Sequence, residues 1–476
     1  MKQLRVAVVG AGPIGLIATQ SILEMGYEVD LINPSQFNDP SPNNSHFENK
    51  STGALAKKTK FGSAHMYQYP ETLISRDANS DYPLSSAIGG LSTVWGANTW
   101  FPAPEELNLH KEFHADYLEA EREITQVLSL MGSQELGQNF NQPISGETPL
   151  SHRFREISRK SVLKSGSPYL GSSLLAVDET GCTKCGSCLT GCPQRVIFSA
   201  DDNWESLLAH PKVKSITAYA LKILNDKSVQ CSANGEIFVT EPYDFIFVAC
   251  GAIATTALLQ RSELIPTTAF LHDTQVIYFP FFTFHKKDPG QSKFTLAQLF
   301  YRSSEIKNGV HVSIYETSSE LPKRAIAQFG NLARLIPAFA WNRIVAGIGF
   351  LPPEISGRLK ISTNDGLSTV VEIPSALSKR EVIRWLKNEF VGFRKSGLHP
   401  LTIGMQIPNV GASYHVGALH DEEGEFLLAP NGEVKRLDGV YVIDSASLPR
   451  IPVGPITVSA MINAKRIVSK IFKGQD

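Results

Sequence analysis

The stretch LRVAVVGAGPIGLIATQSILEMGYEVDLIN, residues 4–33, determines the expected fold of this chain. The apolar run at 6–9 is typical of a buried parallel strand, and G-x-G-x-x-G follows it directly at Gly10, Gly12 and Gly15. In this context the three glycines permit a tight turn, a close approach of the backbone to a pyrophosphate, and close packing of the next helix on the strand. The residues therefore predict a dinucleotide site.

The helix and second strand after the glycines supply the rest of this site. Residues 16–25 have apolar side chains at helical spacing, and Pro13 and Ile14 fall in the first turn, whose free N–H groups attract phosphate. Asp or Glu usually binds the ribose hydroxyls about 20 residues further on. Asn33 ends the second strand here and offers an uncharged amide. A glycine-rich turn in an α/β domain without a ligand is the alternative.

Length and composition fit a globular protein of two or three domains. The chain has 476 residues, of which 42% are hydrophobic and 19% are charged, with a formal net charge of -1. No basic or acidic block favours nucleic acid or an anionic membrane. We expect no signal peptide at the start, and the proline, asparagine and arginine within the apolar stretch at 335–353 argue against a transmembrane segment.

Three later segments share features with one flavoenzyme family. They are IGGLSTVWGANTWFP (88–102), YDFIFVACGAIATTALLQRS (243–262) and DGVYVIDSASLPRIPVGPITVSAMINAKRIV (438–468). Together with the N-terminal turn they resemble the glucose–methanol–choline oxidoreductases, and the loop at 89–95 is similar to the flavin loop of pyranose oxidase. The resemblance implies an α/β fold, with a Rossmann-like FAD-binding domain and a separate substrate domain.

The resemblance also implies which residues contact FAD. A His in the flavin loop of pyranose oxidase carries a covalent flavin bond, and Val94 stands there in this chain, so we expect non-covalent FAD. Asp444 ends an apolar strand and is expected to meet a ribityl or phosphate group, while the helix after it directs N–H groups at the flavin. The expected FAD contacts are Gly10, Gly12, Pro13, Ile14, Gly15, Asn33, Gly89, Gly90, Ser92, Cys250, Gly251, Ala252, Asp444, Pro455 and Ile456.

Oxidation of an alcohol by a flavin needs a base for the hydroxyl proton, and the pKa of histidine suits that task. The stretch GASYHVGALH, residues 411–420, resembles the active-site stretch of the family and aligns His415 with its catalytic His. A structural histidine is the alternative. The family usually has a second His or Asn where Gly454 stands, so His420 and Tyr414 are candidates to complete the site, unless the chemistry is altered.

The resemblance and the composition together predict three parts. Residues 1–265 are the first part of the FAD-binding domain, 266–404 the substrate domain, and 405–476 the last part of the FAD-binding domain with the catalytic His. Short β-branched and aromatic runs within 266–404 predict a mainly antiparallel sheet. The polar segment at 34–60 is expected to be a long surface excursion.

The stretch CTKCGSCLTGCP, residues 182–193, has the ferredoxin spacing C-x2-C-x2-C-x3-C-P and predicts an iron–sulfur cluster on Cys182, Cys185, Cys188 and Cys192. In two-cluster ferredoxins the fourth cysteine serves the other cluster. A [4Fe–4S] cluster completed by Cys192 or Cys231 and a [3Fe–4S] cluster therefore remain alternatives. Zinc is less favoured because its structural sites usually have two separated cysteine pairs, and unligated or disulfide-bonded cysteines come last. Some bacterial sugar dehydrogenases of the resembled family carry a similar insertion, here at about 178–198, with a [3Fe–4S] cluster.

The expected function is an FAD-dependent oxidation of a hydroxyl group on a sugar, polyol or related alcohol. A cluster takes electrons one at a time, so we expect a dehydrogenase with an external acceptor protein in preference to an oxidase. One alternative, favoured by Gly454, is a biosynthetic enzyme acting on a glycoside or natural product. Another is an electron-transfer subunit without substrate chemistry. We expect a cytoplasmic location, while export with a partner subunit, as in some relatives, stays open.

Overall fold

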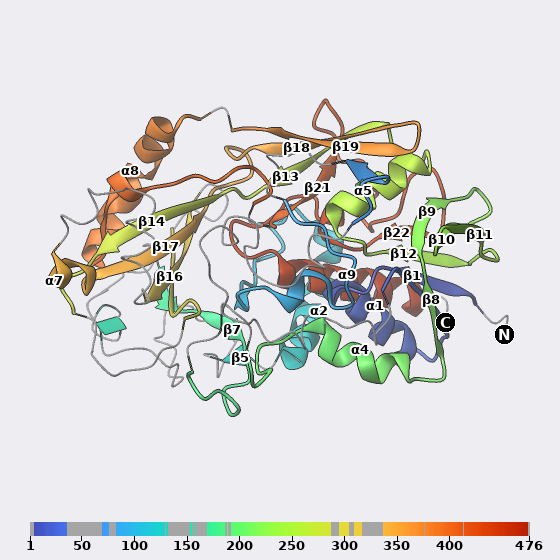
Figure 1. The fold of residues 1–476 in the computed structure, drawn as a ribbon, viewed down its shortest axis with the longest axis horizontal. Helices are drawn as coiled ribbons and strands as arrows, with labels where there is room; N and C mark the ends of the chain where they lie inside the picture. The colour runs from blue at the N-terminus through green and yellow to red at the C-terminus, as the bar shows by residue number, and fades with distance from the viewer. Residues whose placement is uncertain are drawn as a thin grey trace.

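The computed structural model describes residues 4–35, 69–75, 82–128, 130–131, 153–154, 157, 169–185, 188, 192–286, 295–303, 309–316, 337–375, 377–412 and 414–474. The expected surface excursion at 34–60 lies almost entirely outside them. Figure 1 shows an elongated molecule, with a nucleotide-type α/β unit at one end and a sheet flanked by α8 (Lys379–Lys395) at the other.

A five-stranded parallel sheet forms the first unit, in the order β22-β12-β1-β2-β8. Side chains alternate across it, so Val6 and Val8 pack against the helices α1, α2, α4 and α9, while Ala7 and Val9 face α5. The strands are β1 (Val6–Val9), β2 (Val29–Asn33), β8 (Val213–Thr217), β12 (Phe245–Val248) and β22 (Val440–Val442). The helices are α1 (Pro13–Glu24), α2 (His114–Val127), α4 (Ala200–Leu208), α5 (Ala252–Arg261) and α9 (Thr457–Lys473).

An antiparallel three-stranded meander joins β8 to β12 and covers part of the α5 face. Its strands are β9 (Tyr219–Ile223), β10 (Val229–Ala233) and β11 (Glu236–Val239). The predicted α/β fold with a Rossmann-like unit is therefore confirmed, including the strand, turn and helix at residues 6–24.

A six-stranded antiparallel sheet, in the order β20-β14-β17-β16-β15-β6, forms the opposite end of the molecule (Figure 1). Residues Phe281, Tyr301 and Phe393 pack between this sheet and α8, whose first turn has a capping box made by Ser378 and Glu381. The strands are β6 (Tyr169–Ser172), β14 (Val276–Phe282), β15 (Leu299–Arg302), β16 (His311–Glu316), β17 (Ile344–Phe350) and β20 (His399–Pro400).

A second five-stranded sheet, β21-β13-β18-β19-β3, lies between these two ends and packs on α5. The strands at 266–404 are thus divided between two sheets, and β3, β6 and β21 join them from outside that range. The new strands here are β3 (Ile74–Ser75), β13 (Thr268–Asp273), β18 (Arg358–Asn364), β19 (Leu367–Ile373) and β21 (Val416–His420).

The remaining described elements are short, and they complete the connections around the two large sheets. They are η3 (Gly90–Thr93), η4 (Lys111–Phe113), η6 (Thr402–Gly404), η7 (Ser445–Ser447), α7 (Ala338–Trp341), and a small sheet of β4 (Asn98–Thr99), β5 (Leu130–Met131) and β7 (Leu174–Ala176). Within the apolar stretch at 335–353, the strand β17 is largely buried, whereas Phe339 in α7 is 65% exposed. Among the described helices, none is long and apolar enough to cross a membrane.

Candidate active site

The glycine turn between β1 and α1 is packed on two sides and open on the third. Gly10 has a φ of +109°, and a Cβ there would lie 2.4 Å from the carbonyl oxygen of Ala249. A Cβ on Gly15 would lie 1.9 Å from the carbonyl oxygen of Gly10. At Gly12, by contrast, no atom lies within 4 Å of an added Cβ. Two of the glycines are therefore required by the fold, while the third leaves space for a ligand.

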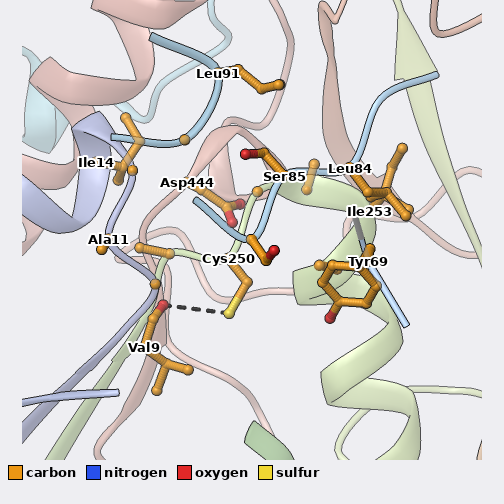
Figure 2. Close-up of a pocket in the computed structure, with 18 of the residues that line it drawn as sticks. Val9, Ala11, Ile14, Tyr69, Leu84, Ser85, Leu91, Cys250, Ile253 and Asp444 are labelled. Carbon is orange, nitrogen blue, oxygen red and sulfur yellow. Dashed lines mark hydrogen bonds between the residues drawn. The ribbon is translucent and has the colours of Figure 1, made fainter. Parts of the chain in front are cut away.

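That open side faces a large cavity on which three helix N-termini converge. The first residues of α1, α5 and α9 all line it, so three sets of free N–H groups and three positive dipole ends meet there. Figure 2 shows Ala11, Ile14, Cys250 and Asp444 around this space. The expected FAD contacts that line it are Gly10, Gly12, Pro13, Ile14, Asn33, Gly90, Cys250, Gly251, Ala252, Asp444 and Ile456.

Asn33 lines the cavity and also holds the glycine turn. Its Oδ1 accepts a hydrogen bond from the backbone N–H of Ala11 at 3.2 Å, and its Nδ2 donates to the carbonyl of Ser35 at 3.3 Å. The side chain is buried, with 5% of its surface exposed. An amide fits this place because it both accepts and donates, whereas a carboxylate would leave the Ser35 carbonyl without this donor.

The loop that begins at Gly89 docks directly on the glycine turn. The N–H of Gly89 donates to the carbonyl of Ala11 at 2.8 Å, and Gly90 lies so close to Gly12 that an added Cβ would come within 3.1 Å of its Cα. The hydroxyl of Ser92 donates to the Gly89 carbonyl at 2.7 Å and accepts the N–H of Ala200 at 2.9 Å. Gly89 and Ser92 thus fix the loop and do not line the cavity.

Asp444 is almost fully buried where β22 ends. Its carboxylate accepts hydrogen bonds from the Thr255 hydroxyl at 2.5 Å and the Ala446 N–H at 3.0 Å, which join η7 to α5. Burial raises its pKa to about 6, although these hydrogen bonds and the N–H of Gly251 act in the opposite direction. The thiol of Cys250 donates to the carbonyl of Val9 at 3.4 Å (Figure 2), and burial raises its pKa to about 12, so it remains a neutral thiol.

Several lining residues have no sequence motif and were not anticipated. Tyr69 and Tyr219 meet edge to face with ring centroids 5.8 Å apart, and both line the cavity. Burial, aided by the neighbouring Cys250, raises the pKa of Tyr69. Ser85 and Ser86 lie just before the flavin-type loop, and that position was the one available signal.

His415 belongs to the segment that borders this cavity, since Gly411, Tyr414 and Val416 line it on either side in sequence. The ring of His415 meets Phe350 edge to face at 5.0 Å. Its Nδ1 is buried and has no hydrogen-bond partner among the described residues. Burial lowers its pKa to about 4, so the imidazole is neutral near pH 7.

The other two expected catalytic residues differ in position. Tyr414 has a φ of +66° and lines the dinucleotide cavity. His420 lies at the far end of β21, where its ring meets His272 at 4.8 Å and Phe426 at 5.6 Å. Its Nδ1 lies 2.7 Å from the carbonyl oxygen of Ala418. The structure therefore does not gather His420 and His415 into one group.

The segment that ends at Gly454 is fixed by a buried ion pair. Glu106 and Arg302 meet at 2.6 Å, and the side chains are 2% and 9% exposed. Glu106 also accepts the N–H of Val453 at 3.2 Å, and Arg302 donates to the Val453 carbonyl at 2.8 Å. The backbone N–H and C=O of Val453 are thus both held, shortly before α9 begins. Gly454 itself has a φ of +151°, which disfavours any side chain there.

The four clustered cysteines line one small pocket, with Gln194 and Leu296 among its other residues. Burial raises the pKa of the Cys182 thiol, and the other three thiols add to the effect, as expected of neighbours. Among the described residues, no group of three or more His, Cys, Asp or Glu side chains is arranged to hold a metal ion. Cys231 lies in β10 within the core and is not among the lining residues of this pocket.

The loop that carries these cysteines begins and ends beside the flavin-type loop. Its stem is closed by the N–H of Asp178, which donates to the Val196 carbonyl at 2.8 Å. The indole N–H of Trp95 donates to the Phe198 carbonyl at 2.7 Å, and the two rings meet edge to face. Residues 89–95 and the base of the cysteine loop are therefore joined directly.

Comparison with known proteins finds matches among solved structures. No family model matches this chain, and no curated protein matches its sequence. Among solved structures, the crystal structure of pyridoxine 4-oxidase from Mesorbium loti matches with a TM-score of 0.61 and 14% sequence identity. The match covers 98% of this chain and 99% of that chain, so the two proteins share a fold over nearly their whole lengths.

Proposed function

We propose that this protein is an FAD-dependent oxidoreductase of the glucose–methanol–choline type that oxidises a hydroxyl group. One observation carries the proposal. A cavity with three helix N-termini and an open glycine turn is bordered by the segment that holds the neutral, buried His415. The fold shared with pyridoxine 4-oxidase supports the same reading.

The residues of the cavity fit FAD. Free N–H groups at three helix starts suit a pyrophosphate and the flavin pyrimidine, where negative charge grows on reduction. The uncovered face of Gly12 leaves room for the phosphates to approach the backbone. When bound, FAD would accept hydride from the carbon of the alcohol. The chain's own residues bind and orient the cofactor, and Val94 in the loop favours non-covalent binding.

His415 is the proposed base. Because burial keeps its imidazole neutral near pH 7, it is able to accept the proton of a hydroxyl held beside it. Phe350 packs edge to face on the ring and limits its rotation. His420 has no part in the proposal because it packs on His272, and Tyr414, which lines the cavity next to His415, is not needed as a second base.

We further propose that the cysteine pocket binds an iron–sulfur cluster that relays electrons to an external acceptor. Four thiols around one pocket are the donor set of such clusters. The hydrogen bond from Trp95 to Phe198 joins the base of the cysteine-carrying loop to the proposed flavin loop, which supports transfer of electrons between them. An acceptor protein and a dehydrogenase reaction follow from this relay, whereas direct use of oxygen would make the protein an oxidase.

The substrate class is proposed as a neutral alcohol, with sugars and polyols first from the resemblance. Pyridoxine joins the candidates because the structural neighbour is named for it. The test panel is therefore D-glucose, benzyl alcohol and pyridoxine, with loss of the visible flavin absorbance measured under anaerobic conditions. Addition of oxygen to the reduced protein then separates an oxidase from a dehydrogenase.

The decisive experiment is anaerobic purification followed by measurement of flavin, iron and acid-labile sulfide per chain. FAD released by heat denaturation is expected, and His415→Phe is expected to slow flavin reduction about 100-fold or more while FAD remains bound. Absence of FAD, or an unchanged rate in His415→Phe, would refute the central proposal. Zinc in place of iron, or iron unchanged when Cys185 and Cys188 are replaced by Ser, would refute only the relay.

A further inference from the structure

His311, in β16, is a buried histidine packed among aromatic rings. Its side chain is 1% exposed, and its ring stacks on Phe300 at 5.5 Å with an interplanar angle of 4°. The indole of Trp100 meets it at 5.2 Å. Neither ring nitrogen has a hydrogen-bond partner among the described residues. A buried polar group without a partner is unfavourable, so phenylalanine would fill the same space without that penalty.

The ring of His311 points at the backbone that leads into α9. A Cβ added to Gly454 would lie 3.5 Å from both Cγ and Nδ1 of His311. Phe350 pairs with His311 across β16 and β17, and its ring contacts the rings of both His311 and His415, at 5.7 and 5.0 Å. Two imidazoles from separate parts of the chain therefore share one enclosed environment.

The charged groups around His311 are already neutralised. Arg302, its cross-strand neighbour in β15, is paired with Glu106 and also donates to the Val453 carbonyl. Burial, then Arg302 and His415, lower the pKa of His311 well below its usual value, so the ring is neutral. A neutral imidazole has one donor and one acceptor nitrogen, and both nitrogens of His311 are available.

Resting on the proposed function above, we propose that His311 forms a second hydrogen bond to the oxygen of the substrate hydroxyl, opposite His415. His415 takes the proton, while the N–H of His311 holds the oxygen and stabilises the negative charge that develops on it. The surrounding aromatic rings and the internally paired Arg302 suit an uncharged alcohol. Gly454 leaves this space to the ring from β16 because it has no side chain.

The test uses the full-length protein with its FAD and compares His311→Phe, His311→Gln and a control, His272→Phe. His272 is another inward-lying histidine, packed on His420 and outside the proposed site. The flavin reduction rate is measured with the fastest of D-glucose, benzyl alcohol and pyridoxine. The melting temperature is measured in parallel, because it reports on packing without any substrate.

We expect His311→Phe to lower the reduction rate about 100-fold while its melting temperature stays equal to or above that of the unmodified protein. His311→Gln retains a donor and is expected to stay within about tenfold, and His272→Phe to keep the full rate. An unchanged rate in His311→Phe, or a lower melting temperature for it, would overturn the role of His311. If none of the three alcohols reduces the flavin, the proposed oxidation of a neutral alcohol is wrong, and the role of His311 falls with it.

The measured rates distinguish a failure of the role proposed for His311 from a failure of the proposed function. If His415→Phe is slow and His311→Phe is as fast as the unmodified protein, only the role of His311 is wrong. If neither substitution changes the rate, or the purified chain holds no FAD, the proposed function itself is wrong.

Discussion

The glycine turn allows a matched test of fold against ligand binding. Gly15→Ala places a Cβ 1.9 Å from the carbonyl oxygen of Gly10, a backbone atom that cannot move away as the end of a flexible side chain could. Gly12→Ala meets nothing within 4 Å, and Gly12 has a φ of -77°, which any residue adopts. The same substitution should therefore destabilise the fold at Gly15 and weaken FAD binding without destabilising the fold at Gly12.

The expected magnitudes follow from these contacts. Overpacking in a well-packed region costs typically about 1–3 kcal/mol, and the backbone overlap places Gly15→Ala at the upper end or above. Gly12→Ala should leave the free energy of unfolding within about 0.5 kcal/mol of the unmodified protein. Its methyl group would displace a phosphate from the backbone N–H groups. Loss of one hydrogen bond to a charged group, about 1.5–3 kcal/mol, weakens FAD binding about 10- to 150-fold.

The assay is urea unfolding of the flavin-free protein, followed by circular dichroism, together with FAD titration followed by flavin fluorescence. Gly15→Ala should unfold at clearly lower urea, whereas Gly12→Ala should unfold normally and bind FAD weakly. Equal unfolding midpoints for the two variants would refute the packing argument. Normal FAD affinity in Gly12→Ala would refute the assignment of the open face to the pyrophosphate.

Two further substitutions probe buried charges. Glu106→Gln leaves Arg302 buried without its counterion and should lower the free energy of unfolding by about 3–5 kcal/mol. The control Glu119→Gln, in an exposed ion pair, should lower it by less than about 1 kcal/mol. Equal losses of the two variants in urea unfolding would contradict this prediction. Burial raises the pKa of Asp444 from 3.8 to about 6, so the folded state binds its proton more tightly and the contribution of Asp444 to stability falls as pH rises through that range. The stability of Asp444→Asn relative to the unmodified protein should therefore rise from pH 4 to 6, and a constant difference in urea unfolding over that range would count against the raised pKa.

Much of the nucleotide-binding unit was predictable because its signals are local. The apolar strand, the spaced glycines and the helix at residues 4–33 are short-range features, and the structure has them where expected. The apolar runs ending near Cys250 and Asp444 were likewise predictable as the neighbouring strands β12 and β22, which line up parallel to β1. The short β-branched and aromatic runs at 274–284 and 309–316 predicted an antiparallel sheet, and β14 and β16 belong to one.

The sequence by itself determined the glycine turn, the α/β class and the cysteine spacing, since each depends on residues close together in the chain. Only the tertiary structure decided which distant residues meet. It separated His420 from His415, engaged Asn33 with the glycine turn, and brought His311 from β16 against Gly454. The physical reason is that such contacts depend on strand register and on the packing of sheets against each other, and local periodicity carries no information about which strand will be the neighbour.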